Sequence, residues 1–401
     1  LLSLFLMGFS LDSFSQTSQQ YDIVIKGGQV IDPETKLNAV RNIGINENRI
    51  VEISTEELNG TQVIDASGLI VSPGFIDLHV HGTSNVEQAY QVHDGVTSAF
   101  ELEGGLPFLK DYFKLRESNA LINYGASVNL GMGRIHAKHP EEFNQLVKSR
   151  ADGQSLDRKI SAVIGGTSYE TLRKSEYKTM LDHVENGLSE GGIGIGVPVG
   201  YWPGSSREEL YRVYELAGAL QVPIFSHVRQ GGAIAIQQAI SDAILTDAPL
   251  HIVHVNSSAL SEISLAIEMV NKAQSKGFDI TTELYPYTAA STGLGSAIFD
   301  EGWKESLGID YGDLQWVETG ERLTAATFNE YRKTGGTVII HMMKPEWIKA
   351  GLSTKGTMVA SDGMPYAKLA HPRTAGTFSR VLGKYVREEK VLSLSQAIEK
   401  M

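Results

Sequence analysis

Apolar and polar positions alternate along the chain in two different ways, and the pattern changes near residue 73. Residues 21–72 contain short apolar runs of strand type, separated by Gly, Asn and Asp turns, and they predict a small β module. From Pro73 onward, apolar runs alternate with longer segments whose apolar residues recur at helical spacing. This second pattern is typical of βα units packed around a parallel sheet.

The second region contains eight runs with the length and composition of inner strands. They lie at residues 74–81, 96–103, 123–130, 191–198, 222–227, 250–255, 279–287 and 357–362. Helical segments separate them, such as residues 206–220 and 231–245. Eight strands with intervening helices predict an α/β fold, a (β/α)8 barrel of the TIM type over residues 73–401.

The connection before the last predicted strand is too long for a plain loop. It holds a helical stretch and an extra strand-like run at residues 337–341. We therefore expect a lid or insertion around residues 293–341.

The two ends of the chain carry patterns of their own. Residues 1–20 have an apolar core followed by small and polar residues, which predicts a signal peptide remnant and leader, and hence a periplasmic or secreted protein. The alternative is a buried N-terminal helix. The apolar run is too short to cross a bilayer, so we expect no stable membrane insertion. Residues 392–401 resemble the start of a helix without a stop signal, which suggests a fragment at both ends.

Composition narrows the chemistry more than it narrows the fold. The 401 residues are 42% hydrophobic, and the net charge of -12 argues against a nucleic-acid partner. The chain contains no Cys. Disulfides and thiolate metal sites are therefore excluded, and His and carboxylate side chains must hold any metal.

Such side chains gather at the ends of the predicted strands, where barrel enzymes place their chemistry. Five strand ends contribute His79 and His81, Glu101 and Glu103, His227, His254, and Asp362. A single strand-end His is more often a packed core or rim residue, but five such ends in one barrel indicate a metal site. Imidazole and carboxylate without thiolate suit zinc or a similar divalent ion.

The run PGFIDLHVHG (73–82), together with His227, His254 and Asp362, resembles the amidohydrolase superfamily. Further stretches are similar to one subgroup, the D-aminoacylases or N-acyl-D-amino-acid deacylases. They are GYWPGSSREEL (200–210), FSHVRQ (225–230), LYPYTAAST (284–292), VASDGMP (359–365) and the long, specific HPRTAGTFSRVLG (371–383). The resemblance covers nearly the whole chain after residue 21. It implies that residues 21–72 form part of a small β-sandwich whose other half would follow Met401.

The resemblance also raises the question of what would join two metal ions. Many members of the superfamily use a carboxylated Lys on the fourth strand, but here that strand reads GGIGIGVP. D-aminoacylases use a Cys at the end of the second strand, where this chain reads ELEGG (101–105). The resemblance therefore implies a bridging glutamate. We favour Glu103 and keep Glu101 as the alternative, with the other one as the partner of a ligating His.

The same resemblance implies roles for Asp362, Tyr285 and Ser291, and side-chain chemistry and position suggest roles for Arg229, Arg373 and His371. Asp362 would be the general base and acid, a metal ligand, or both. Tyr285 and Ser291 match positions whose hydroxyls hold the substrate. Arg229 and Arg373 would pair with an amino-acid carboxylate or form structural salt bridges. His371 would stabilise the transition state or position a lid.

The expected function is zinc-dependent hydrolysis of N-acyl-D-amino acids or similar small amides, with one or two ions per chain. Asn256 stands where related sequences often have Lys, which disfavours acidic substrate side chains. A cyclic amidase similar to dihydroorotases, or an isoaspartyl-type dipeptidase, is the alternative, although those enzymes usually need the missing Lys. A catalytically inactive binding protein is a third hypothesis, against which the intact set of histidines and Asp362 argues. The oligomeric state does not follow from the sequence.

Overall fold

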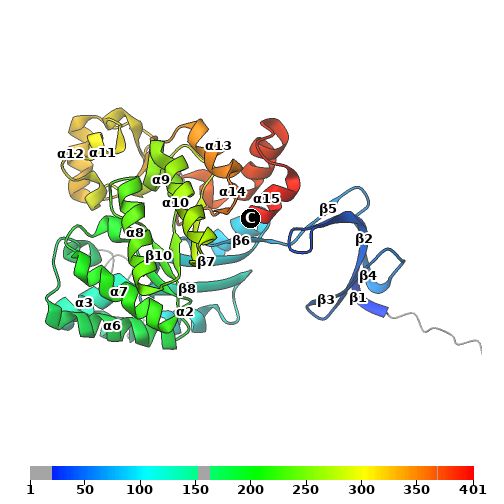
Figure 1. Ribbon diagram of the computed structural model, residues 1–401, viewed down its shortest axis with the longest axis horizontal. Helices are drawn as coiled ribbons and strands as arrows, with labels where there is room; N and C mark the ends of the chain where they lie inside the picture. Colours follow the sequence, from blue (N-terminus) through cyan, green and yellow to red (C-terminus); the bar gives the residue numbers. More distant parts are fainter. Residues whose placement is uncertain (1–19, 152–162, 368) are drawn as a thin grey trace, which may run out of the picture. The chain divides into compact units, whose positions relative to one another are not determined.

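The computed structural model describes residues 20–151, 163–367 and 369–401 (Figure 1). The chain divides into two compact units, Leu1–Pro73 and Gly74–Met401. The predicted signal segment at residues 1–19 lies outside the described residues. Within the described ranges, no helix is both long enough and apolar enough to cross a membrane.

The first unit is a five-stranded sheet. Its strands are β1 (Gln20–Asp32), β2 (Leu37–Asn46), β3 (Arg49–Ser54), β4 (Asn59–Asp65) and β5 (Ile70–Val71). The order is β3-β2-β1-β4, and β5 also pairs with β1. Tyr21, Val24 and Ile43 are buried in this unit, whereas Ile50 and Val63 are exposed.

The second unit contains the eight predicted strands as one parallel sheet. They are β6 (Phe75–Asp77), β7 (Val96–Leu106), β8 (Asn123–Asn129), β9 (Ile195–Val197), β10 (Ile224–Ser226), β11 (Leu250–Ile252), β12 (Ile280–Leu284) and β16 (Thr357–Val359). Neighbouring strands pair in chain order, and a parallel bridge between Val80 and Gly363 joins the two ends of the sheet. The prediction of a TIM-type barrel is therefore confirmed. Most of its strands are shorter than predicted, because the polar residues after them belong to loops.

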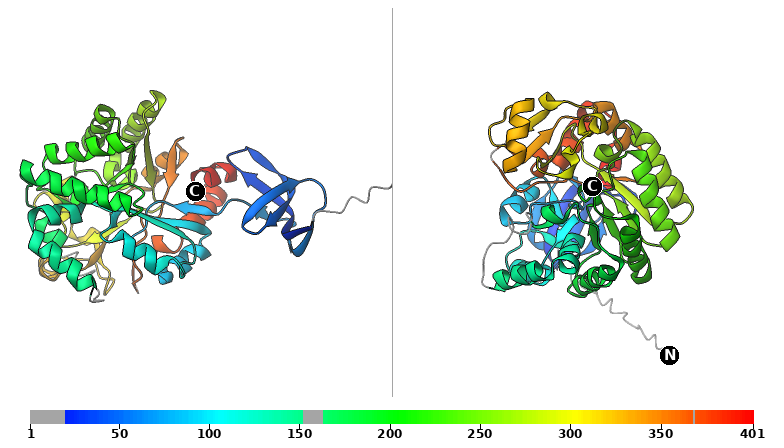
Figure 2. Two further views of the ribbon diagram at one scale, coloured as in Figure 1. Left: turned by 90° about the horizontal axis from the view of Figure 1, so that it is seen from below. Right: turned by 90° about the vertical axis from the view of Figure 1, so that its left-hand side faces the viewer.

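Helices surround the barrel strands, as the right-hand view in Figure 2 shows. Those between the strands are α1 (Asn85–His93), α2 (Leu109–Arg116), α3 (Leu130–Lys138), α4 (Pro140–Ala151), α6 (Lys174–Ser189), α7 (Arg207–Leu220), α8 (Ala233–Thr246), α9 (Val255–Ala259), α10 (Ile263–Ser275) and α13 (Pro345–Ser353). The helices predicted at residues 206–220 and 231–245 are confirmed as α7 and α8. α7 begins where the Ser206 side chain accepts a hydrogen bond from the Glu209 backbone, and it buries Leu210, Val213 and Ala217.

The long connection after β12 forms a small sheet of its own. β13 (Ala290–Gly293) and β14 (Leu314–Trp316) both pair antiparallel with β15 (Thr337–Ile340), the extra strand predicted from the sequence. The helices α11 (Trp303–Leu307) and α12 (Ala325–Thr334) pack against each other through the stacked rings of Trp303 and Phe328, and α12 packs against the sheet through Tyr331 and Trp316. We call residues 290–340 the insertion; it is yellow and orange in Figure 1.

The chain continues from β16 into the segment that carries the long motif of residues 371–383. It contains α14 (Thr377–Arg380), a π-helix (Val381–Glu388) and α15 (Leu394–Lys400). The buried Asp94 carboxylate accepts hydrogen bonds from the backbone of Phe378 and Ser379 and so fixes the start of α14. Arg380 and Tyr385 both donate to the carbonyl of Pro286, which ties this segment to the loop after β12.

Candidate metal centre

Four histidines from three strand ends converge inside the barrel. His79 and His81 follow β6, His227 follows β10, and His254 follows β11. Their imidazole nitrogens lie close together, since His79 Nε2 is 3.2 Å from His81 Nε2 and His254 Nε2 is 3.1 Å from His227 Nδ1. The histidines thus form two pairs, His79 with His81 and His227 with His254.

Glu103 lies between the two pairs. Its Oε2 is 3.1 Å from His79 Nε2 and 3.0 Å from His81 Nε2. Its Oε1 is 2.6 Å from His227 Nδ1 and 3.3 Å from His254 Nε2. Each carboxylate oxygen therefore faces one pair of imidazoles.

The structure places Glu103 in this position through an irregularity of β7. Glu101 pairs with Ala126 of β8, but the next paired residue of β7 is Leu106, so residues 102–105 bulge out of the ladder. Gly105 in this bulge has a φ of +65°, which glycine adopts without strain. The bulge directs Glu103 towards the histidines.

Within the described residues, two groups of donor atoms are close enough together to hold a metal ion. The first comprises His79, His81 and Glu103, and the second comprises Glu103, His227 and His254. Imidazole nitrogen and carboxylate oxygen are donors that suit zinc. The donor set therefore fits one or two zinc ions, with Glu103 shared by both groups.

The nitrogen that each of three histidines turns away from Glu103 has its own partner. His81 Nδ1 lies 2.9 Å from Glu101 Oε2, His254 Nδ1 lies 3.1 Å from Ser258 Oγ, and His79 Nδ1 lies 2.9 Å from Glu283 Oε1. Such outer partners fix the tautomer and orientation of a ligating imidazole. Glu101 belongs to neither donor group, and its geometry is that of a partner of His81.

Carboxylates govern the charge of the first pair. Burial alone would lower the pKa of His79, but the charges of Asp362 and Glu103 outweigh it and raise the pKa to about 10. Burial also opposes protonation of His81, yet Glu101 and Asp362 hold its pKa well above the ordinary value. In contrast, burial and the neighbouring His254 lower the pKa of His227. The site attracts cations, and a metal ion would compete with protons for His79 and His81.

Asp362 lies at the edge of the first pair. It follows β16 with a φ of +51°, an unusual conformation for a residue with a side chain. Its Oδ1 is 3.3 Å from His81 Nε2 and 3.6 Å from His79 Nε2, and its Oδ2 is 2.9 Å from Arg373 Nη1. Although burial raises the pKa of Asp362, the charges of Arg373 and His79 lower it overall.

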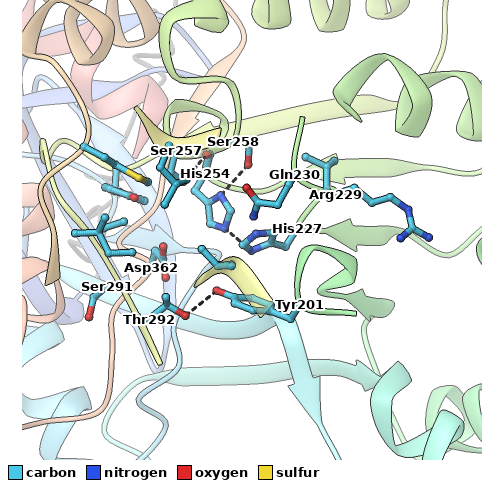
Figure 3. A pocket seen from close by; sticks show the side chains of 17 residues that line it. Tyr201, His227, Arg229, Gln230, His254, Ser257, Ser258, Ser291, Thr292 and Asp362 are labelled. Atoms are coloured by element: carbon cyan, nitrogen blue, oxygen red, sulfur yellow. Dashed lines mark hydrogen bonds between the residues drawn. The ribbon is translucent and has the colours of Figure 1, made fainter. Parts of the chain in front are cut away.

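A pocket opens onto His227, His254 and Asp362 (Figure 3). One part of its wall carries hydroxyls and an amide, from Tyr201, Gln230, Ser257, Ser258, Ser291 and Thr292. Another part is aliphatic, from Ile298, Leu307, Ile340 and Met342. Most of this aliphatic wall belongs to the insertion, which therefore covers the strand ends that carry the site.

Two of the predicted substrate-binding residues line this pocket with hydroxyl groups that are free to bind a ligand. Tyr285 and Ser291 are buried, and neither hydroxyl has a hydrogen-bond partner of good geometry among the described residues. A buried hydroxyl without a partner is costly, which makes both groups available to a ligand.

The other three predicted substrate-binding residues are placed differently. The guanidinium of Arg229 points away from His227 and His254 and donates to the Ser205 carbonyl at 2.5 Å (Figure 3). Arg373 is 1% exposed, and it pairs with Asp362 and donates to the Ser291 carbonyl. Arg373 thus has a salt-bridge partner, whereas Arg229 donates to a backbone carbonyl. His371 packs against Tyr287, accepts from the Arg373 backbone, and does not line the pocket.

Several residues of the site did not stand out in the sequence. Glu283 is the one charged residue of the buried strand β12, and this contrast was a usable signal. Tyr201, the last residue of a 3-10 helix (Val199–Tyr201), lies 4.6 Å from His227, ring centre to ring centre. It belongs to the stretch of residues 200–210 that resembles the deacylases, but nothing within that stretch singled it out. At Gly200, an added Cβ would lie 2.4 Å from His227 Cδ2, so glycine makes room for the imidazole.

Comparison with known proteins places these residues in context. No family model matches the chain. The N-acyl-D-glutamate deacylase of Alcaligenes xylosoxydans xylosoxydans is 26% identical over 415 residues, which cover 96% of this chain and 82% of that protein. The D-aminoacylase of the same organism is 24% identical over 424 residues, covering 96% and 83%. A dihydroorotase of Lactococcus lactis is 26% identical, but the match covers only 71% of this chain and 65% of the enzyme.

A solved structure extends the similarity to the fold. The N-acyl-D-glutamate deacylase of Bordetella bronchiseptica, complexed with zinc and a phosphonate inhibitor, has a TM-score of 0.78 and 21% identity. The match covers 96% of this chain and 84% of that one. Sequence and fold agree over nearly the whole length, and this chain is therefore homologous to the D-aminoacylases or N-acyl-D-amino-acid deacylases of the amidohydrolase superfamily.

Proposed function

We propose that this protein is a zinc-dependent hydrolase that cleaves the amide bond of N-acyl-D-amino acids or similar small amides. One observation carries the proposal: the two oxygens of Glu103 face two pairs of histidines at the base of a pocket. A structural carboxylate needs one counter-charge, whereas this one has four imidazoles around it. The homologous deacylases supply the substrate class.

His79, His81, Glu103 and Asp362 would hold one zinc ion, and Glu103, His227 and His254 a second. Zinc in such a site lowers the pKa of water towards neutrality and polarises a carbonyl. Glu103 would take the bridging role of the Cys in D-aminoacylases, because a carboxylate offers one oxygen to each ion. Its negative charge would also offset the charge of the metal.

Asp362 would move the proton. It lies beside His79 and His81 and lines the pocket, so it can take a proton from the attacking water and return it to the leaving amine. Arg373 holds the second oxygen of Asp362. The first oxygen thereby stays directed towards the histidines.

The pocket would bind the substrate through neutral contacts. The unpartnered hydroxyls of Tyr285 and Ser291 can donate to the carboxylate or carbonyl of an N-acyl amino acid. The aliphatic wall of Ile298, Leu307, Ile340 and Met342 offers a surface for an uncharged side chain or acyl group. Among the described lining residues, Arg229 alone is cationic, and its guanidinium points away from the histidines.

A cyclic amidase is the second candidate, because dihydroorotases also match this chain. The fourth barrel strand, β9, contains neither Lys nor an acidic residue, so the bridge that such enzymes usually have is missing. A periplasmic or secreted location is proposed on the sequence of residues 1–20 alone, and cell fractionation with an antibody would test it.

A hydrolysis screen of the zinc-loaded full-length protein tests the function. We expect turnover of N-acetyl-D-amino acids, much slower turnover of the L-enantiomers, and none of cyclic amides or β-aspartyl dipeptides. Glu103→Gln should bind less zinc at both groups and lose activity. Turnover of cyclic amides alone would support the second candidate, and no turnover by a zinc-saturated protein would favour a binding protein.

A further inference from the structure

Glu283 is a buried carboxylate that belongs to neither group of metal donors. It lies in β12 and is 0% exposed. Its Oε1 accepts a hydrogen bond from His79 Nδ1 at 2.9 Å and another from the backbone N–H of His254 at 2.7 Å. Burying a carboxylate is expensive, and these two hydrogen bonds offset part of the cost. What needs an explanation is why a carboxylate is buried here at all.

The contact with His79 selects the donor atom of that imidazole. A zinc ion bound to His79 would displace one of the two protons of the charged imidazole, and the carboxylate beside Nδ1 would keep the remaining proton there. Nε2 then keeps its lone pair. Nε2 is the atom that lies 3.1 Å from Glu103 Oε2 and 3.2 Å from His81 Nε2, where the first donor group converges.

The contact with His254 supports an unusual backbone conformation. His254 has φ +33° and ψ 57°, in the left-handed region that residues with a Cβ rarely adopt. Such a conformation is strained and persists only when its surroundings hold it. In this conformation His254 Nε2 lies 3.3 Å from Glu103 Oε1, in the second donor group.

Among the outer partners in the described part of the chain, Glu101, Ser258 and Glu283, only Glu283 reaches both groups. Glu101 contacts His81, and Ser258 contacts His254, each on a single histidine. Glu283 alone among these three partners joins a residue of the first group to a residue of the second. It does so from one oxygen atom, so the two contacts cannot vary independently.

We propose that Glu283 is the positioning residue of the metal centre, which fixes the Nδ1–H tautomer of His79 and the backbone of His254 and so directs one Nε2 towards each ion. The inference rests on the proposed function, because it assumes that the two groups bind zinc. Glu283 acts through the histidines and does not contact the substrate pocket.

Zinc affinity, measured by competition with a chromophoric chelator, tests this role directly. Glu283→Leu removes the acceptor, and we expect zinc to bind 10- to 100-fold more weakly. Glu283→Gln keeps an acceptor oxygen and should lose less than tenfold. Thr282→Val is the matched control, because Thr282 is equally buried in the same strand but donates to the Ile252 carbonyl, away from the histidines. It should bind zinc within twofold of the wild type.

A spectrum of the ¹⁵N-histidine-labelled, zinc-loaded protein provides the second readout. The His79 signal, assigned with a His79→Gln variant, should show a protonated Nδ1 in the wild type and in Glu283→Gln. A merely structural Glu283 would lower the unfolding midpoint of the variants but leave the zinc affinity and the tautomer unchanged.

The outcomes separate this inference from the proposed function. If the wild type binds no zinc, the proposed function fails. If the wild type binds zinc and Glu283→Leu binds it as tightly as Thr282→Val does, only the role of Glu283 is overturned. Should Glu283→Leu not fold, Glu283→Gln decides, because wild-type affinity together with a His79 proton on Nε2 would refute the inference.

Discussion

The barrel unit contains two buried clusters of charge that differ in their balance. In the first, Arg134 of α3 forms an ion pair with Glu209 of α7, and Arg134 also donates to Ser205 and to the carbonyl of Glu170. One cation meets one anion. In the second, the metal centre, Glu101, Glu103, Glu283 and Asp362 are all buried, and Arg373 is the buried guanidinium beside them.

The difference shows how a structural cluster can be told from a functional one. The Arg134 cluster is complete, because its charges cancel and it joins two helices of the outer layer. The metal centre has four carboxylates for one guanidinium, and its histidines become positive only by binding protons. An excess of buried acid that faces imidazole nitrogens calls for a cation. Burial alone or the presence of charge alone does not separate a structural cluster from a functional one; the balance of buried positive and negative charges does.

The largest expected effect comes from the acidic residue that lines the pocket. Asp362→Asn removes the proton acceptor but keeps the shape of the side chain, so turnover should fall by about 10²–10⁴-fold. Zinc content should be largely retained, because the other donors remain. Steady-state kinetics and metal analysis on the same sample measure both quantities. Turnover near that of the wild type would exclude Asp362 as the base.

Breaking the balanced cluster should affect stability and leave the metal centre intact. Arg134→Met leaves Glu209 buried without its partner and should lower the free energy of unfolding by about 3–5 kcal/mol. Arg134→Met combined with Glu209→Leu should recover most of this loss. Denaturant unfolding measures the stability, and zinc content should stay unchanged in both variants. If the single variant lost zinc instead, the two clusters would not be independent.

The charge of the substrate side chain tests whether the pocket is neutral or, like the metal centre, suited to a charged partner. N-acetyl-D-leucine should be hydrolysed with a kcat/KM about 10- to 100-fold above that of N-acetyl-D-glutamate, because a second carboxylate would meet the aliphatic wall. Met342→Lys places a cation in that wall and should narrow the ratio, whereas Met342→Leu should not. Competition assays with both substrates measure the ratio directly. A preference for the acidic substrate in the wild type would contradict the neutral pocket.

The smallest effect concerns a titratable group outside both clusters. Burial and the neighbouring His136 lower the pKa of His183 to about 4. The unfolded chain binds a proton near pH 6.5, whereas the folded chain does not until pH 4, so stability should fall as the pH drops through this window. Because His183 is only partly buried, we expect about 1–2 kcal/mol. Denaturation of His183→Gln between pH 7 and 4 should show a shallower loss of stability than the wild type shows.

Much of the fold was predictable from local patterns. The eight inner strands, the helices α7 and α8 and the extra strand β15 follow from apolar periodicity and from turn residues. The ends of the strands were less predictable, since His227 and His254 were expected inside strands but lie just after them. Hydrophobicity marks where a chain is buried, and it does not mark where the hydrogen-bonded ladder stops.

The sequence by itself determined the barrel, the set of His and carboxylate residues at five strand ends, and the exclusion of thiolate ligands. These depend on composition and on order along the chain. Only the tertiary structure decided that Glu103 lies between both histidine pairs, that Arg373 pairs with Asp362, and that Glu283 holds His79 across 204 positions of sequence. Such contacts depend on the bulge in β7 and on the directions of side chains in the loops after the strands. The bulge and these directions arise from packing between segments that are far apart in the sequence, and local sequence patterns do not predict such packing.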